Sequence, residues 1–372
     1  MKLSPGMRAS LEHALAEGLT FACFRSPGGL LTLWAQRTPE LERVDRLLLF
    51  ELNDVFLLAP FELSPDSIPF IRSDVELVQS DLEPEAELLY PCEGSEASGP
   101  SLQPTTSEAI FKEGVERIKQ RIAEGLLQKA VLSRVLVTQL DHRHRVDLFE
   151  AALMDRPDAF VALVHTPDHG TWMGASPERL LHAEDDRVRV DALAGTRSLE
   201  HGAEPWGEKE QNEQELVTTS VLNTFVHLHL KEVLLHGPET VTAGTVQHLR
   251  SVVEAGLEEV PLADVLIALH PTPAVGGTPR TEAHELIRTL EEHDRRLYTG
   301  FWGPWSADGT TELFVNLRCL QLFPSKALLY VGAGITAGSD ADLEWNETAQ
   351  KARTWLQLFE KLEPLRVSSS PQ

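Results

Sequence analysis

The sequence predicts an α+β fold rather than a doubly wound parallel sheet, and two observations support this class. Long apolar or alternating segments, typical of antiparallel strands, recur along the chain. Amphipathic helical segments are interleaved with them. The 372 residues suffice for one large domain or two ordinary ones, with a sizeable buried core.

Composition and charge exclude several kinds of binding partner and indicate a cellular compartment. The formal net charge is −24, so the chain repels nucleic acid and anionic membranes, and neither is an expected partner. Its three cysteines (Cys23, Cys92 and Cys319) are widely spaced, which argues against a zinc knot or a disulfide framework and fits a reducing cytoplasm. The sequence shows neither a signal-peptide pattern nor an apolar run long enough to span a bilayer. We therefore expect a cytoplasmic protein.

The first 90 residues contain short apolar runs that predict strands, at 19–24, 30–34, 47–50 and 55–58. Residues 91–106 have the composition of a linker, rich in Pro, Gly and Ser. We expect a variable N-terminal part at 1–100, a functional core at 105–362 and a disordered tail at 363–372.

From residue 107 onward, helical and strand patterns alternate. Ser107 is a predicted helix N-cap, and Gly125 ends that helix. The other expected elements are strands at 127–137, 159–165, 171–175 and 188–197 (the last ending in a glycine turn), a helix at 205–236 stopped by Gly237, a strand from 246, a helix, an irregular segment at 269–279, a helix at 282–296 and a strand at 312–320.

The segment 330–351 predicts a strand, a glycine turn at 332–334 and a helix capped by Ser339 or Asp340. On that helix Glu344, Glu347 and Lys351 share one face. A second pair with the same spacing is Glu210 and Glu213. Two such pairs offer enough carboxylate oxygens for Mg²⁺, although from spacing alone ordinary solvated glutamates are the more frequent explanation.

Other polar residues lie in apolar surroundings, each with two interpretations. Lys129 either extends to solvent or has its amine in a pocket, where it can act as a base. Glu178 is either a helix N-terminal carboxylate or a general acid with a raised pKa. Arg318 either binds a substrate carboxylate or pairs with an acidic side chain in the core. His248 and His270, considered alone, are more often structural.

Together these segments resemble the chorismate-using enzymes: isochorismate synthase, salicylate synthase, and the large subunits of anthranilate and aminodeoxychorismate synthase. The resemblance covers about residues 105–360. Its motifs, in the order of that family, are 129–134 (KAVLSR), 174–178 (GASPE), 194–197 (AGTR), 209–214 (KEQNEQ), 270–279 (HPTPAVGGTP), and 332–334 (GAG) with 344–347 (EWNE). The resemblance implies one large α+β domain of antiparallel sheets flanked by helices.

The resemblance also implies roles for individual residues. Glu213 and Glu347 match direct Mg²⁺ ligands, and Glu210 and Glu344 match partners that act through water. Lys129 matches the general base, Glu178 the general acid and His248 an active-site histidine. The positions expected to contact chorismate are Thr196, Ala274, Tyr298, Arg318, Gly332 and Lys351. Chorismate is a dianion, so an acidic protein needs local positive charge to bind it.

Within the family, a base at Lys129 favours water as the nucleophile, because ammonia-using members have Gln there or Lys at the position of Ala194. Members that also eliminate pyruvate tend to have Thr at the position of Ala274. The sequence therefore predicts an isochorismate synthase, with salicylate synthase and anthranilate or aminodeoxychorismate synthase component I as alternatives. The product would enter menaquinone or siderophore synthesis.

One departure from the family lies on the helix that carries the expected Mg²⁺ ligands Glu210 and Glu213. There Gln211 and Gln214 replace the Arg and His common in the family. We expect the metal site to survive, since the carboxylates persist. The same departure motivates another hypothesis, a catalytically inactive relative that binds an aromatic-pathway anion and regulates a partner. We expect a monomer or a weak homodimer, since nothing in the sequence demands a partner subunit.

Overall fold

The computed structural model describes residues 1–79, 86–95, 99–199, 204–243 and 246–362. Within them the strands form two nine-stranded antiparallel sheets. The first sheet contains, in spatial order, β14 (Gly277–Thr278), β7 (Lys129–Gln139), β18 (Lys326–Ile335), β17 (Cys319–Leu322), β9 (Gly170–Ser176), β8 (Phe160–Thr166), β1 (Phe21–Arg25), β2 (Thr32–Ala35) and β6 (Val75–Val78). The second contains β12 (Lys231–Ala243), β13 (Val246–Gly256), β11 (Arg187–Ser198), β10 (Arg179–Glu184), β16 (Thr311–Val315), β15 (Phe301–Trp305), β4 (Val55–Ala59), β5 (Ile68–Arg72) and β3 (Glu42–Val44).

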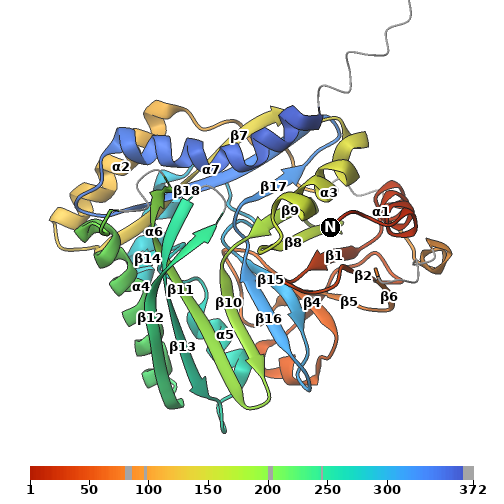
Figure 1. The fold of residues 1–372 in the computed structure, drawn as a ribbon, viewed down its shortest axis with the longest axis horizontal. Coiled ribbons are helices and arrows are strands. Elements are labelled where there is room, and N and C mark those ends of the chain that lie inside the picture. Colours follow the sequence, from red (N-terminus) through yellow and green to blue (C-terminus); the bar gives the residue numbers. More distant parts are fainter. Residues whose placement is uncertain (80–85, 96–98, 200–203, 244–245, 363–372) are drawn as a thin grey trace, which may run out of the picture.

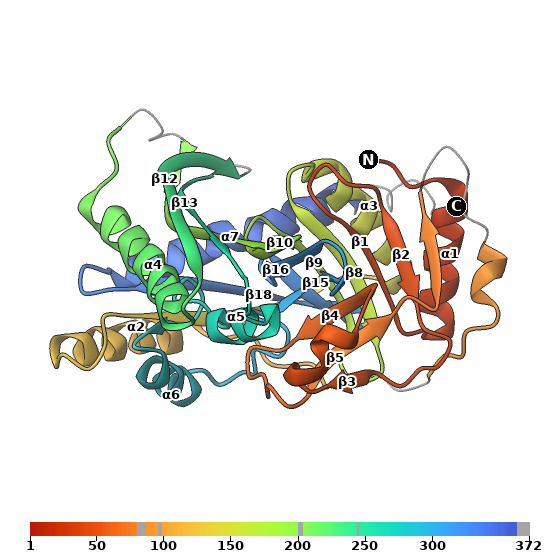
Figure 2. The ribbon, with the colours of Figure 1, turned by 90° about the horizontal axis from the view of Figure 1, so that it is seen from below.

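Helices flank both sheets (Figures 1 and 2). They are α1 (Pro5–Glu17), α2 (Glu108–Ala123), α3 (Arg145–Asp155), α4 (Glu208–His227), α5 (Leu262–Leu269), α6 (Arg280–Leu290) and α7 (Ala341–Leu362). Figure 1 shows α7 running along β18 of the first sheet, whereas α4 packs on β11 and β13 of the second. The predicted α+β class is therefore confirmed. No helix in the described part of the chain is long and apolar enough to cross a membrane.

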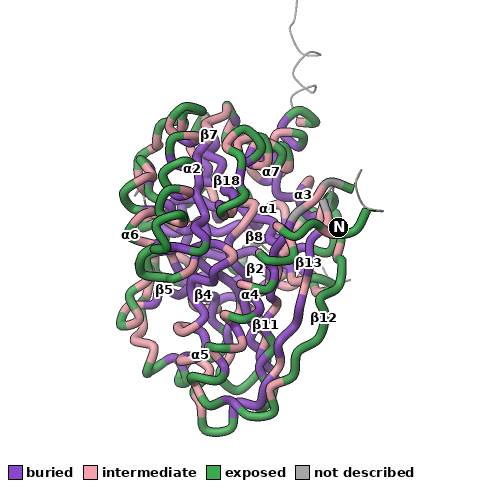
Figure 3. The backbone as a smooth tube through the Cα atoms, turned by 90° about the vertical axis from the view of Figure 1, so that its left-hand side faces the viewer, coloured by how far each residue is buried: buried purple, intermediate pink, exposed green. Residues whose placement is uncertain are grey.

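The core is layered, which explains why many strands are apolar at every position. In β1, Phe21 and Cys23 belong to the core beneath the helices of the first sheet, while Ala22 and Phe24 belong to the core between the sheets. A strand covered on both faces needs no polar alternation. Figure 3 shows the result, with most strands buried inside and with the loops, the outer helix faces and the strand β12 exposed.

Residues 1–100 supply strands to both sheets. β1 pairs with β8, and β4 pairs with β15, so each sheet joins N-terminal strands to strands from the later part of the chain. Part of the predicted linker is also tied to the core, because Thr105 and Thr106 accept hydrogen bonds from the β7 backbone through their hydroxyl groups. Residues 363–372, expected to be a disordered tail, lie outside the described residues.

The C-terminal end of one expected helix and the type of one expected strand were wrong, because local contacts or strand pairing override sequence propensity. The helix expected at 205–236 ends at His227, and residues 231–236 belong to β12, which pairs with β13. The expected strand at 47–50 is a 3-10 helix, started where the Asp45 side chain accepts a hydrogen bond from the Leu47 N–H.

Other expectations differ at the segments that shape the site. The helix at 282–296 ends at Leu290, and Glu291 adopts an extended conformation that takes its carboxylate inward. The single strand at 312–320 is two strands, β16 and β17, which lie in different sheets. The glycine turns at Gly195 and at 332–334 are not turns: Gly195 is a bulge within β11, and both Gly332 and Gly334 are paired inside β18.

Candidate active site

A pocket lies between strands of both sheets and is lined by β7, β18, β11, β13, α4, α7 and the loops that connect them; we call it the central pocket. The predicted residues that line it are Lys129, Glu178, Glu210, Glu213, His248, Ala274, Tyr298, Arg318, Gly332, Glu347 and Lys351. Glu344 is not among the lining residues. The side chain of Thr196 lies outside what the structure describes.

Lys129 begins β7 and is completely buried. Its Nζ donates a hydrogen bond to Glu213 Oε1 at 2.7 Å. Of the two predicted environments, the amine is therefore inside the pocket and does not extend to solvent. The close approach depends on Gly334 of β18, where a Cβ atom would lie 2.9 Å from Lys129 Cε and 2.6 Å from Glu213 Oε1. A buried lysine side chain requires such a hydrogen-bond partner, because burial of an unpaired polar group is costly.

Glu178 lies in the connection between β9 and β10 rather than at a helix N-terminus. The Ser176 hydroxyl positions this connection: it accepts a hydrogen bond from the Glu178 N–H at 3.2 Å and donates one to the Val315 carbonyl at 2.6 Å. Burial raises the pKa of the Glu178 carboxyl from 4.5 to about 8, against the opposing charge of Lys129. At neutral pH this side chain holds a proton that it can donate.

Positive charge reaches the pocket from the segment between β16 and β17 and from α7. The chain crosses from one sheet to the other at 316–318, and Arg318 takes a left-handed conformation there (φ 48°). Arg318 Nη1 donates to Thr354 Oγ1 at 3.2 Å. Lys351 Nζ donates to the Gly332 carbonyl at 2.8 Å and to Glu347 Oε1 at 2.7 Å. The two cations suit a carboxylate ligand.

Tyr298 and Gly332 meet at the same wall. A Cβ atom on Gly332 would lie 2.8 Å from the Tyr298 hydroxyl and 3.1 Å from the Leu132 carbonyl, so only glycine leaves this wall open. Burial raises the pKa of Tyr298, which therefore keeps its hydroxyl proton as a donor.

Four glutamates were predicted to hold Mg²⁺, and lysines contact three of them. Besides the Lys129–Glu213 and Lys351–Glu347 pairs, Lys209 Nζ lies 2.7 Å from the buried Glu344. Within the described residues, no three His, Cys, Asp or Glu side chains are grouped closely enough to hold a metal ion. The donor chemistry nevertheless fits Mg²⁺, because carboxylates of α4 and α7 line one cavity.

The environments of the two α7 carboxylates differ. Burial, together with the charge of Glu347, raises the pKa of Glu344 against the opposing Lys209. Burial also acts to raise the pKa of Glu347, but the Lys351 ammonium outweighs it and holds that pKa below the ordinary value. Glu347 therefore stays ionised at neutral pH.

His248 lies on β13, opposite Thr196 of β11, and its Nδ1 is 3.2 Å from the Gly195 carbonyl oxygen. Burial and the nearby Arg318 and Lys351 lower the pKa of His248 to about 4, so the ring is neutral at neutral pH. His270 Nε2 lies 3.2 Å from both the Pro60 and the Phe61 carbonyl oxygens, and His270 does not line the central pocket.

Among the polar side chains that line the pocket, the sequence did not indicate a role for two, Lys209 and Tyr330. Lys209 directly precedes Glu210 in the 209–214 motif, and that adjacency is the signal that could have identified it. Tyr330 stacks on Tyr298 with ring centroids 5.6 Å apart. An aromatic residue inside an apolar strand carries no local sign of such a role.

Comparisons with known proteins agree with this geometry. Residues 65–357 match the family model described as chorismate binding enzyme. The chain is 31% identical over 270 residues to the isochorismate synthase EntC of Escherichia coli K12, covering 69% of this chain and 68% of the relative. It is 33% identical over 274 residues to the isochorismate synthase DhbC of Bacillus subtilis 168, covering 68% and 69%.

The fold has a counterpart of known structure. The menaquinone-specific isochorismate synthase MenF of Escherichia coli superposes with a TM-score of 0.76 over 94% of this chain and 90% of that chain, at 22% identity. The shared two-sheet architecture, the extent of the family match and the relatives above lead to one conclusion: this chain belongs to the chorismate-binding enzyme family.

Proposed function

We propose that this protein is an Mg²⁺-dependent isochorismate synthase, an isomerase that moves the ring hydroxyl of chorismate. The observation that carries the proposal is the occurrence of Lys129 and a protonated Glu178 in one pocket, beside the cations Arg318 and Lys351. Relatives with at least 30% identity that bear the name isochorismate synthase support the same activity.

The chemistry follows from these side chains. Arg318 and Lys351 bind a substrate carboxylate. The Lys129 amine accepts a proton from water, and the resulting hydroxide attacks the ring carbon that lies between the carbons bearing the carboxylate and the enolpyruvyl ether. Glu178 protonates the departing hydroxyl, which leaves as water while the ring double bonds shift. One water is added and one is lost, so the product is an isomer of the substrate.

In this proposal Glu213 and Glu347 would hold Mg²⁺ directly, and Glu210 and Glu344 would act through water. When bound, the ion would offset the charge of the second substrate carboxylate. The Glu213 and Glu347 carboxylates now contact Lys129 and Lys351, so the ion and these lysines would compete for the same oxygens.

The test is incubation with chorismate and Mg²⁺, followed by chromatographic separation of the products. Isochorismate as the main product supports the proposal. Salicylate with pyruvate would assign the chain to the lyases, and anthranilate formed only with ammonia would assign it to the amidotransferases. Tight chorismate binding without turnover would indicate a regulatory binder. Rescue of strains lacking menaquinone-specific or siderophore-specific isochorismate synthase would then assign the pathway.

A further inference from the structure

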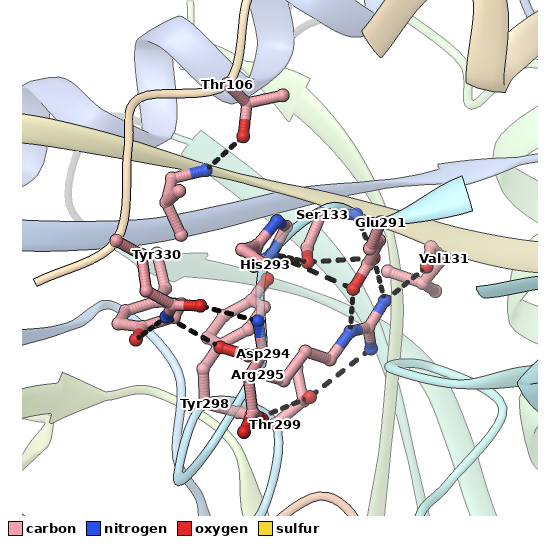
Figure 4. A network of polar contacts seen from close by, with 12 residues as sticks. Thr106, Val131, Ser133, Glu291, His293, Asp294, Arg295, Tyr298, Thr299 and Tyr330 are labelled. Atoms are coloured by element: carbon pink, nitrogen blue, oxygen red, sulfur yellow. Dashed lines mark hydrogen bonds and ion pairs between the residues drawn. The ribbon is translucent and has the colours of Figure 1, made fainter. Parts of the chain in front are cut away.

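The loop after α6 contains a buried ion pair that the proposed chemistry does not use. Arg295 and the Glu291 side chain are each about 3% exposed, and Arg295 Nη2 lies 2.6 Å from Glu291 Oε1. We propose that Glu291 and Arg295 are positioning residues that join three walls of the central pocket and thereby set its affinity for chorismate. This inference rests on the proposed function. Figure 4 shows the network around them.

Arg295 connects two walls through backbone carbonyls. Its Nη2 donates to the Val131 carbonyl of β7 at 2.6 Å, and its Nη1 donates to the Val275 carbonyl at 2.9 Å. Val131 and Val275 both line the central pocket, and Val275 follows Ala274, the position expected to distinguish synthase from lyase. The Nε atom donates to Glu291 Oε2 at 2.8 Å, so every nitrogen of the guanidinium is engaged.

Glu291 ties the same loop to β7 by a second contact. Its Oε1 accepts hydrogen bonds from the Ser133 N–H at 2.7 Å and from the Ser133 hydroxyl at 2.8 Å. The Ser133 hydroxyl also lies 2.8 Å from His293 Nε2. Ser133 pairs with Gly332 of β18 on its other side. On this side of β7 the Glu291 carboxylate thus accepts the backbone hydrogen bond that a neighbouring strand would otherwise accept. β7 is also the strand that carries Lys129.

The third wall is Tyr298. Its N–H donates to the Arg295 carbonyl at 2.8 Å, so the turn that begins at Arg295 sets the position of the ring. Tyr298 then stacks on Tyr330, and both rings line the pocket. Displacement of Arg295 would therefore move Tyr298, Val131 and Val275 together.

Stability alone is a weak explanation for such a pair. Desolvation of two charges offsets much of their attraction, and apolar replacements of buried pairs are often neutral or stabilising. The planar fork of arginine can bridge two carbonyls and a carboxylate at once, whereas a lysine ammonium cannot reproduce that geometry. Arg295→Lys therefore keeps the charge and removes the bridge.

The experiment compares Arg295→Lys and Glu291→Gln with wild type by steady-state kinetics, chorismate calorimetry and thermal unfolding. We expect the KM and the calorimetric Kd for chorismate to rise about tenfold or more in both variants, with kcat changed much less. The matched control is Arg288→Lys: Arg288 makes an exposed two-point contact with Glu62 (2.8 and 2.7 Å), away from the pocket, and its variant should retain wild-type KM.

A lowered unfolding temperature with unchanged KM and Kd would overturn the inference, since the pair would then serve stability alone. Failure of both variants to fold would overturn it for the same reason. These outcomes are distinct from failure of the proposed function, in which wild-type protein would form no isochorismate.

Discussion

At the residue scale, Lys129 and Glu178 line one pocket in different surroundings. Lys129 Nζ donates a hydrogen bond to Glu213 Oε1 at 2.7 Å, whereas the Glu178 carboxyl is buried and its pKa is raised to about 8. Two groups with separate environments can take separate roles, one accepting a proton and the other donating it. Substitution can therefore test each role independently.

Lys129→Ala should lower kcat by about 10²–10⁴-fold, the usual contribution of general acid–base catalysis. Chorismate should still bind, because Arg318 and Lys351 remain, and calorimetry measures this. The control is Lys119→Ala, which removes a surface lysine that pairs with Glu116. A near-normal rate for Lys129→Ala would eliminate Lys129 as the base.

Glu178 predicts a pH dependence for turnover. A general acid must be protonated, and the carboxyl pKa is raised to about 8, so kcat should fall as pH rises through 8. The pH profile of kcat measures this limb. Glu178→Gln should abolish turnover, whereas Glu184→Gln, at an exposed position on β10, should not change the profile.

The same carboxyl should affect stability with a definite sign. Between its ordinary pKa of 4.5 and the folded-state value of about 8, the unfolded chain loses the proton and the folded chain keeps it, so wild type loses stability as pH rises. Glu178→Gln removes this effect. Its unfolding free energy relative to wild type should increase by up to about 1.4 kcal/mol per pH unit in that window. Denaturant unfolding at several pH values would show no such trend if the carboxyl were solvated.

At the element scale, β18 and α7 bring the binding groups together. The sequence pattern placed Glu344, Glu347 and Lys351 on one helix face. In the structure Lys351 contacts Glu347 and both line the pocket, whereas Glu344 contacts Lys209 and does not line it. The Asp340 side chain caps α7 by accepting from the Asp342 and Leu343 N–H groups. The glycines before it were misplaced, since residues 332–334 lie within a paired strand rather than a turn.

Gly332→Ala should raise the KM for chorismate about tenfold, because the new methyl group would lie 2.8 Å from the Tyr298 hydroxyl and displace it. Steady-state kinetics and thermal unfolding measure the effect on binding and on the fold. The matched control is Gly338→Ala, since no atom lies within 4 Å of a Cβ at Gly338. Equal KM values for the two variants would contradict the conclusion that Gly332 keeps the pocket wall beside Tyr298 open.

At the scale of the whole molecule, the N-terminal residues are part of both sheets. Phe24 and Phe56 come from the first 100 residues and pack with Phe160 between the sheets, at centroid distances of 6.1 and 6.4 Å. Removing this part would uncover the edges of β8 and β15 and open the aromatic core.

A chain that begins at residue 105 should therefore fail to fold cooperatively and should aggregate, because two sheet edges and the inter-sheet core are exposed. Size-exclusion chromatography and calorimetric unfolding measure this. Co-expression of residues 1–100 as a separate fragment is the control and should restore soluble protein. A monomeric, active 105–372 fragment would contradict the prediction.

The sequence by itself determined the elements with strong local patterns, the α+β class and, through its motifs, the residues that gather in one pocket. These depend on periodicity and residue identity, which are local. Only the tertiary structure decided that 231–236 is a strand, that Arg318 lies at a crossing between sheets and that Glu291 turns inward to Arg295 and Ser133. Each of those outcomes depends on a partner distant in sequence, because strand pairing and the satisfaction of buried charge are long-range interactions.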